Sequence, residues 1–203
     1  MFRYACSAVG AAALCTIATF GQPSLAKTIF PEYDASGRLK IPQGYENWVF
    51  VGSNLGLAYK PDAVAFTAQE AERAGHQLFH NIYIDPAAYA EFVRAGTFPD
   101  PTILVMENYA AETKDAGGVL SEGFFNGSLV RVEVAVKNSK RPTKPGSVET
   151  WAYYFFPLGA DGRPIEAAVP LADQACHACH QRHAGPDNVW VQFYPQLRRW
   201  LKP

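Results

Sequence analysis

The motif Cys176-His177-Ala178-Cys179-His180 constrains this chain more than any other feature of its sequence. On a helix, positions i, i+3 and i+4 share one face, so two thiols and the imidazole of His180 would lie side by side. A disulfide between cysteines this close would stabilise little, because the loop that it closes is so short. The motif therefore indicates a bound cofactor or a redox function.

Cys-x-x-Cys-His is the spacing that attaches haem in c-type cytochromes. The thiols bond to the vinyl groups, and the histidine binds the iron as an axial ligand. A zinc site using Cys176, Cys179 and His180 or His183 would lack a second ligand pair. A redox dithiol would be expected early in the fold, after a strand in a βαβ unit. We predict one covalent haem c with His180 as iron ligand, and His177 and His183 on the exposed side of the helix.

Residues 1–26 have the pattern of a secretory signal peptide: Arg3, an apolar run at 8–20 and small residues before the cleavage point. The run is short for a membrane span. A lipoprotein anchor at Cys15 is the alternative, but this cysteine lies inside the apolar run. We expect a single domain over residues 27–203, exported to the periplasm and not attached to a membrane. Covalent haem attachment of this kind occurs outside the cytoplasm, which agrees with the predicted export.

The composition of the chain predicts a folded, roughly neutral protein. Its 203 residues suffice for one domain, and 48% are hydrophobic and 13% aromatic, which favours a packed core over disorder. The formal net charge of -1 gives no reason to expect nucleic acid or an anionic membrane as partner. A small uncharged ligand and a transient redox partner protein both suit such a surface.

Five segments have the composition of β-strands, and one of them alternates strictly. In that segment, 129–137, four valines would face one way and Arg131, Glu133, Ala135 and Lys137 the other. The five predicted strands are 47–52, 78–84, 101–109, 129–137 and 150–156.

Helices are predicted between and after these strands. Thr67 and Glu70 form a capping box for a helix ending at Gly75. Asp85 can cap a second helix, which Gly96 would end. A third would carry the cysteines, and 191–201 would form the last. The order of elements predicts an α+β fold, a mostly antiparallel five-stranded sheet with a C-terminal haem-binding helix.

A covalent haem does not by itself define a function, because the sixth iron position decides it. Electron carriers fill this position, often with methionine, whereas gas binders and enzymes leave it open. Met106 is the one methionine after the predicted signal peptide. The candidates for a sixth ligand are therefore Met106, His76 and His80.

Several segments resemble the cytochrome P-460 family, in the family's order and from about residue 31 to 197. They are YDASGRLKIPQGYENWVFVG at 33–52, IYIDPAAY at 82–89, VAVKNSK at 134–140, WAYYF at 151–155, the terminal haem motif and FYP at 193–195. The resemblance implies a homodimeric, mainly β fold with the haem against the sheet. It also implies one of two activities: hydroxylamine oxidation with a lysine cross-linked to the haem, or binding of nitric oxide or carbon monoxide without the cross-link, as in cytochromes c-prime-beta.

The resemblance assigns three positions of the distal pocket. The cross-linking lysine of the enzymes falls at Met106, whose thioether has no amine for that bond, and their distal arginine falls at His80. Their acidic distal base matches Glu133. From their own patterns, His80 would point inward with Ile82, either as a core histidine or as a pocket residue. Met106 would be core filler or pocket wall, and Glu133 a solvated residue or a base.

Three functions remain open from the sequence. The first is a haem protein that binds a small diatomic ligand, with nitric oxide expected, at a site walled by His80, Met106 and aromatics such as Phe79. The second is an enzyme acting on hydroxylamine, nitrogen oxides or peroxide, with Glu133 or His80 as the acid–base group. The third is an electron carrier with a filled sixth position.

Overall fold

The computed structural model describes residues 26–57, 77–113, 123–139, 150–172 and 176–201. The predicted signal peptide, apart from Ala26, lies outside these residues, as do the helix expected to end at Gly75 and the candidate ligand His76.

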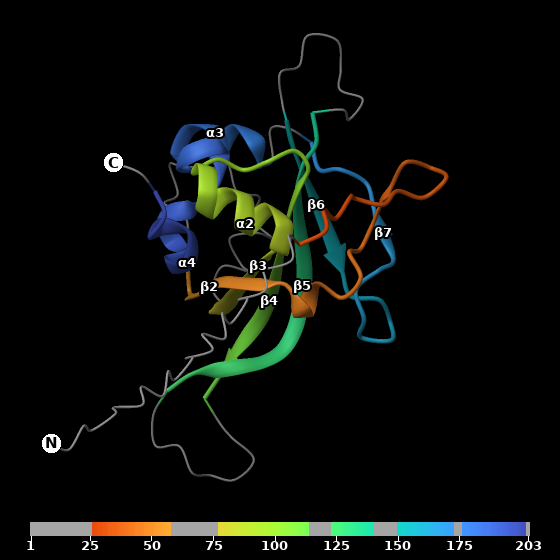
Figure 1. Ribbon diagram of the computed structural model, residues 1–203. Helices are drawn as coiled ribbons and strands as arrows, with labels where there is room; N and C mark the ends of the chain where they lie inside the picture. The colour runs from red at the N-terminus through yellow and green to blue at the C-terminus, as the bar shows by residue number, and fades with distance from the viewer. Residues whose placement is uncertain (1–25, 58–76, 114–122, 140–149, 173–175, 202–203) are drawn as a thin grey trace, which may run out of the picture.

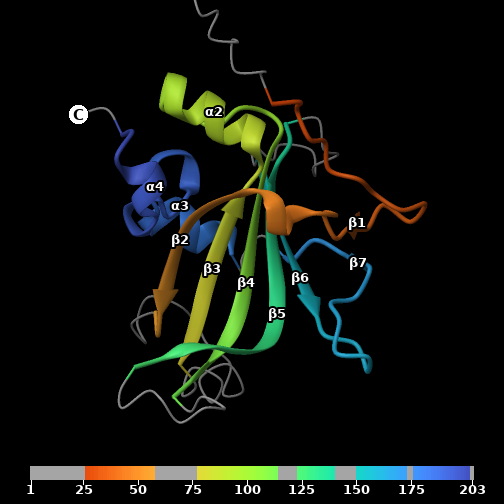
Figure 2. The same ribbon diagram turned by 60° about the horizontal axis from the view of Figure 1, so that its bottom comes forward.

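A five-stranded antiparallel sheet forms the centre of the molecule (Figure 1). Its strands follow one another in chain order, so each one turns back beside its predecessor, as Figure 2 shows. All five were predicted, and the α+β fold is confirmed. The strands are β2 (Val49–Leu55), β3 (Leu78–Ile84), β4 (Thr102–Glu112), β5 (Phe125–Lys137) and β6 (Trp151–Pro157).

The two faces of this sheet bury two separate hydrophobic clusters, because successive side chains of a strand point to opposite sides. One face carries Val105, Val132 and Tyr154 and packs against the N-terminal segment; we call it the N-terminal face. The other carries Leu104, Met106 and Trp151 and packs against the C-terminal segment and Phe92; we call it the helical face. The haem motif belongs to the segment that covers the helical face.

The N-terminal face is covered by elements that the sequence did not predict. A two-stranded antiparallel sheet pairs β1 (Leu39–Lys40) with β7 (Ala167–Ala168), and neither strand is among the five predicted ones. The 3-10 turn η1 (Tyr45–Asn47) follows β1. Tyr45 donates a hydrogen bond of 2.9 Å to the buried Glu107, on the side of the sheet away from the haem motif.

Helix α2 (Pro86–Ala95) forms as its sequence predicts. The carboxylate of Asp85 accepts a hydrogen bond from the Ala88 N–H at 2.8 Å, and Gly96 ends the helix with φ 78°. The same carboxylate accepts from the Ile103 N–H at 3.0 Å, which ties the helix to β4. Burial raises the pKa of Asp85, while these backbone donors oppose the rise.

The C-terminal segment forms four short helices instead of two longer ones. They are α3 (His177–His183), η2 (Pro186–Asn188), η3 (Val191–Phe193) and α4 (Pro195–Arg198). The prediction of one helix over 191–201 is wrong, because Pro195 disfavours helical backbone at Tyr194, which is extended. The helix α4 packs closely on β2, where a Cβ on Gly52 would lie 3.1 Å from Pro195 Cδ.

The predicted alternation of β5 holds only up to a β-bulge. Val132, Val134 and Val136 are buried on one face as expected. Between the pairs Asn108↔Arg131 and Tyr109↔Leu129 the register shifts by one residue, so Val130 is the extra residue of a bulge. Val130 is 39% exposed, and Leu129 packs on the N-terminal face in its place.

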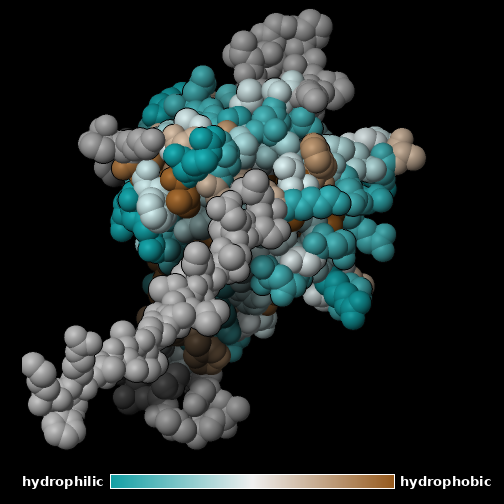
Figure 3. Space-filling model, viewed as in Figure 1, coloured by the Kyte–Doolittle hydropathy of each residue, from teal (hydrophilic) through white to brown (hydrophobic). Residues whose placement is uncertain are grey.

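The side of the molecule seen in Figure 3 is mostly hydrophilic where it is not covered by grey atoms. Among the described helices, none is both long and apolar enough to cross a membrane.

Candidate haem site

The haem motif forms most of α3, on the side of the sheet that faces the helices (Figure 1). Cys176 caps its N-terminus, and Cys179 and His180 follow within it. Both cysteines are half-buried, and neither is part of a disulfide in the described structure. Burial raises the pKa of the Cys179 thiol, and the nearby Arg182 lowers it to a smaller extent. The two thiols are thus partly accessible for bonding to a cofactor.

The imidazole of His180 is held at both ring nitrogens. The indole Nε1–H of Trp190 donates to His180 Nε2 at 3.0 Å. Nε2 is therefore the unprotonated nitrogen, and Nδ1 carries the proton, which it donates to the Asn188 carbonyl oxygen at 2.9 Å. This tautomer is the one that a histidine needs to bind a metal through Nε2.

Aromatic rings surround this imidazole. The ring of Tyr153, on β6, lies 4.6 Å from the His180 ring, and the ring of Trp190 lies 5.3 Å away. Burial lowers the pKa of His180, the bond to Asn188 raises it, His177 lowers it and Glu133 raises it to smaller extents. The neutral form, which alone can bind a metal, is therefore favoured.

The other two histidines of the motif region differ from each other. His183 is exposed, as expected. His177 is only 7% exposed, so its predicted place on the exposed side of the helix is wrong. As the first residue of a short helix, it points toward the molecule while Ala178 points away from it.

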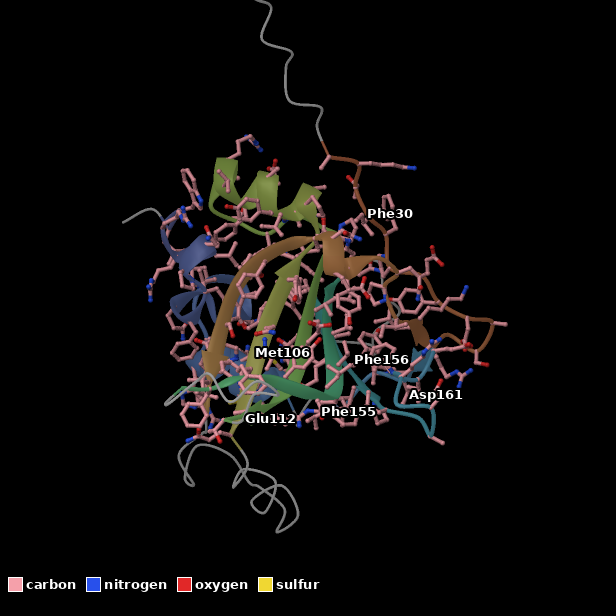
Figure 4. The ribbon with its side chains drawn as sticks, turned by 90° about the horizontal axis from the view of Figure 1, so that it is seen from below. Phe30, Met106, Glu112, Phe155, Phe156 and Asp161 are labelled. Carbon is pink, nitrogen blue, oxygen red and sulfur yellow. The ribbon has the colours of Figure 1, made fainter. Side chains whose placement is uncertain are left out.

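Two rows of side chains cross the helical face of the sheet near the motif. One row runs from Asn54 through His80 and Asn108 to Arg131, each paired with the next across neighbouring strands. The next row runs from Ile82 through Met106 and Glu133 to Phe155. Figure 4 labels Met106 of β4 and Phe155 of β6, which Glu133 of β5 separates. The first row is thus polar throughout, and the second is apolar except for Glu133.

Glu133 forms an ion pair on this face. Its Oε1 accepts a hydrogen bond of 2.6 Å from Arg131 Nε and a long one of 3.5 Å from Asn108 Nδ2. Arg131 also lies over the ring of Phe155, 5.9 Å from its centroid. Glu133 is therefore half-buried and paired with Arg131, whereas the pattern of its strand suggests a solvated residue.

His80 points into the same face as Ile82, as the sequence predicts. Burial lowers its pKa, the charge of Glu133 raises it and the charge of Arg131 lowers it. A neutral ring at this position can donate one hydrogen bond and accept another.

A family model of cytochrome P460 matches residues 42–191. This chain belongs to the cytochrome P460 family. The family binds haem, so the chain is a haem cytochrome, and the resemblance seen in its sequence is confirmed. No curated protein matches the chain.

The helical face of this cytochrome P460 chain suits a haem beside α3. It combines a neutral histidine with an unprotonated Nε2, two thiols on the same helix and a wall of Ile82, Leu104 and Met106. The amide oxygen of Asn108 also lies on this face, fully buried and without a hydrogen-bond partner among the described residues. Such an orphaned acceptor is unusual in a packed core and marks a place where a further group can bind.

Two observations limit the fit and correct the predicted site. Trp190 must release Nε2 before this atom can bind a metal. Phe79 pairs with Tyr109 and Leu55 on the N-terminal face, because it directly precedes His80 in the strand. The expectation that Phe79 shares a pocket wall with His80 is therefore wrong.

Four residues of the cytochrome P460 site were not selected from the sequence: Asn108, Arg131, Asn188 and Trp190. The alternation of β5 already placed Arg131 on the same face as Glu133, which was a usable signal. Asn188 and Trp190 reach His180 only through the turns after α3, which no local pattern predicts. Among the described residues, no three His, Cys, Asp or Glu side chains are grouped as in a metal cluster.

Proposed function

We propose that this chain is an exported mono-haem cytochrome c, attached through Cys176 and Cys179, that binds a small diatomic ligand such as nitric oxide. The hydrogen bonding of His180 supports this most strongly. A carbonyl on Nδ1 orients the ring and increases its basicity, and the remaining Nε2 is the atom that binds iron. The bound haem would supply an iron with one further position for a ligand.

The residues of the sheet would form the distal pocket. Met106, Ile82 and Leu104 give it an apolar wall, which suits an uncharged diatomic molecule better than an ion. Met106 offers no amine for a bond to the haem, so the haem would keep its ordinary chromophore. The neutral ring of His80 would donate a hydrogen bond to the ligand.

Replacing His80 by leucine should weaken ligand binding without removing the haem. A single hydrogen bond contributes about 0.5–1.5 kcal/mol, so nitric oxide and carbon monoxide should dissociate roughly two- to tenfold faster. Stopped-flow displacement from the ferrous protein measures this rate. His183→Leu, at an exposed position, is the control. Equal rates in wild type and His80→Leu would contradict this role for His80.

An oxidoreductase is the second candidate, favoured by the Glu133 carboxylate on the face that also holds His80. Its charge acts on both His80 and His180. Such a carboxylate is suited to take a proton from hydroxylamine or peroxide. Turnover of hydroxylamine with a dye acceptor, lost in Glu133→Gln, would favour this function, although Met106 argues against the cross-linked haem of the enzymes.

We also propose export to the periplasm, association as a homodimer and contact with a small redox partner protein. The pattern of residues 1–26 supports export. The homodimer is what the resemblance of the sequence to the family implies. Cell fractionation tests the first and light scattering the second. An electron carrier with a filled sixth position is the third candidate, and a ferrous protein that does not bind carbon monoxide would favour it.

A further inference from the structure

The turn that holds His180 has an unusual backbone. Asp187 and Asn188 adopt φ angles of 58° and 61°, in the left-handed region that glycine prefers. A residue with a Cβ is strained in this region, although Asn and Asp tolerate it better than most. Surrounding contacts must therefore fix this turn, and it is the turn whose Asn188 carbonyl accepts from His180 Nδ1.

The contacts that fix the turn at Asp187 and Asn188 come from the end of β5 and the start of β6. Lys137, the last residue of β5, donates from Nζ to Asp187 Oδ2 at 2.5 Å. Its Nζ also donates to the Phe98 carbonyl at 2.8 Å. The indole of Trp151, which pairs with Lys137 across the strands, donates a long bond of 3.5 Å to Asp187 Oδ1.

This ion pair is more protected than the others of the described structure. The Lys137 and Asp187 side chains are 17% and 27% exposed, against 23% and 31% for Arg131 and Glu133, the next most buried pair. Lys137 is fixed by a second acceptor, and the buried ring of Trp151 packs edge-on against Phe98, 6.1 Å between centroids. An ion pair between partners this well fixed contributes more than a solvated surface pair.

We propose that Lys137 and Asp187 are positioning residues for the proximal histidine, acting through the Asn188 carbonyl. This inference rests on the proposed role of His180 as iron ligand. The ion pair holds the strained turn, the turn presents the carbonyl at 2.9 Å, and the carbonyl orients the His180 ring. The pair would therefore tune a bound iron through the orientation and basicity of His180.

Lys137→Met and Asp187→Asn should weaken the bond at Nδ1 and so make His180 a weaker donor to the iron. Resonance Raman spectra of the ferrous protein should show the iron–histidine stretch at lower frequency. The reduction potential should rise, because a less basic ligand favours the ferric state less. If His180 favours the ferric over the ferrous state ten times less strongly, the reduction potential of this one-electron couple rises by about 59 mV.

Three further variants make the result specific. Lys137→Arg keeps the charge and should restore both readouts. Asp187→Gly removes the charge but permits the left-handed backbone, so it separates backbone strain from the ion pair. Asp34→Asn removes the surface pair with Arg38 and should change neither readout.

The outcomes distinguish this proposal from the proposed function. If the haem is attached and His180 binds iron, but Lys137→Met and Asp187→Asn alter only the melting temperature, the ion pair is merely structural and this proposal is wrong. If His180→Ala leaves the iron–histidine stretch of the parent protein in place, the proximal assignment itself fails. A lowered stretch with a raised potential, restored in Lys137→Arg, supports the proposal.

Discussion

Replacing His180 by alanine is expected to abolish the proximal ligation of the haem while leaving the covalent attachment intact. The imidazole lies between Trp190 and the Asn188 carbonyl, and it offers Nε2 as the donor atom. Of the other two histidines of α3, His183 is exposed and His177 lies at the start of the helix. The iron–histidine stretch in ferrous resonance Raman spectra should therefore disappear.

His183→Ala is the matched control and should leave this spectrum unchanged. Because alanine opens a space beside Tyr153 and Trp190, added imidazole should enter it and restore part of the signal. A His180→Ala protein with an unchanged iron–histidine stretch would show that another residue binds the iron.

Replacing both Cys176 and Cys179 by serine is expected to abolish covalent attachment completely. The thioether bonds need sulfur, and serine keeps the size and position of the side chain. Denatured wild-type protein should retain haem, seen by peroxidase staining after electrophoresis and by the mass of the intact chain. The double variant should lose it to acidified acetone.

The single variants sharpen this result. Cys176→Ser and Cys179→Ser should each retain one thioether and therefore a smaller fraction of bound haem. Retention of covalent haem in the double variant would contradict the proposed attachment and point to another side chain. Since serine does not disturb the His180 bonds, loss of attachment should not be accompanied by unfolding.

The strands and helix α2 were predictable because their signals are local. Alternation places Val132, Val134 and Val136 on one face without reference to the rest of the chain. Asp85, Pro86 and Gly96 mark the ends of α2 by backbone chemistry alone. For the same reason the haem motif was evident at once, since its three residues lie within one turn of helix.

What the sequence did not predict depends on contacts between distant segments. The bulge at Val130 comes from the register between β4 and β5, and β7 forms only because β1 is there to pair with it. The hydrogen bonds of His180 come from Asn188 and Trp190, beyond the end of α3. The prediction for Phe79 was wrong because it rested on the aromatic side chain alone. Phe79 and His80 are adjacent in the strand, so their side chains point to opposite faces.

The reduced absorption spectrum, recorded before and after adding carbon monoxide, tests the central claim most directly. We predict the Soret band of an ordinary haem c, because Met106 cannot form the cross-link, and a clear shift with carbon monoxide, because the distal position is open. A strongly red-shifted Soret band in the reduced protein would contradict the first part. A low-spin ferrous spectrum that carbon monoxide leaves unchanged would contradict the second.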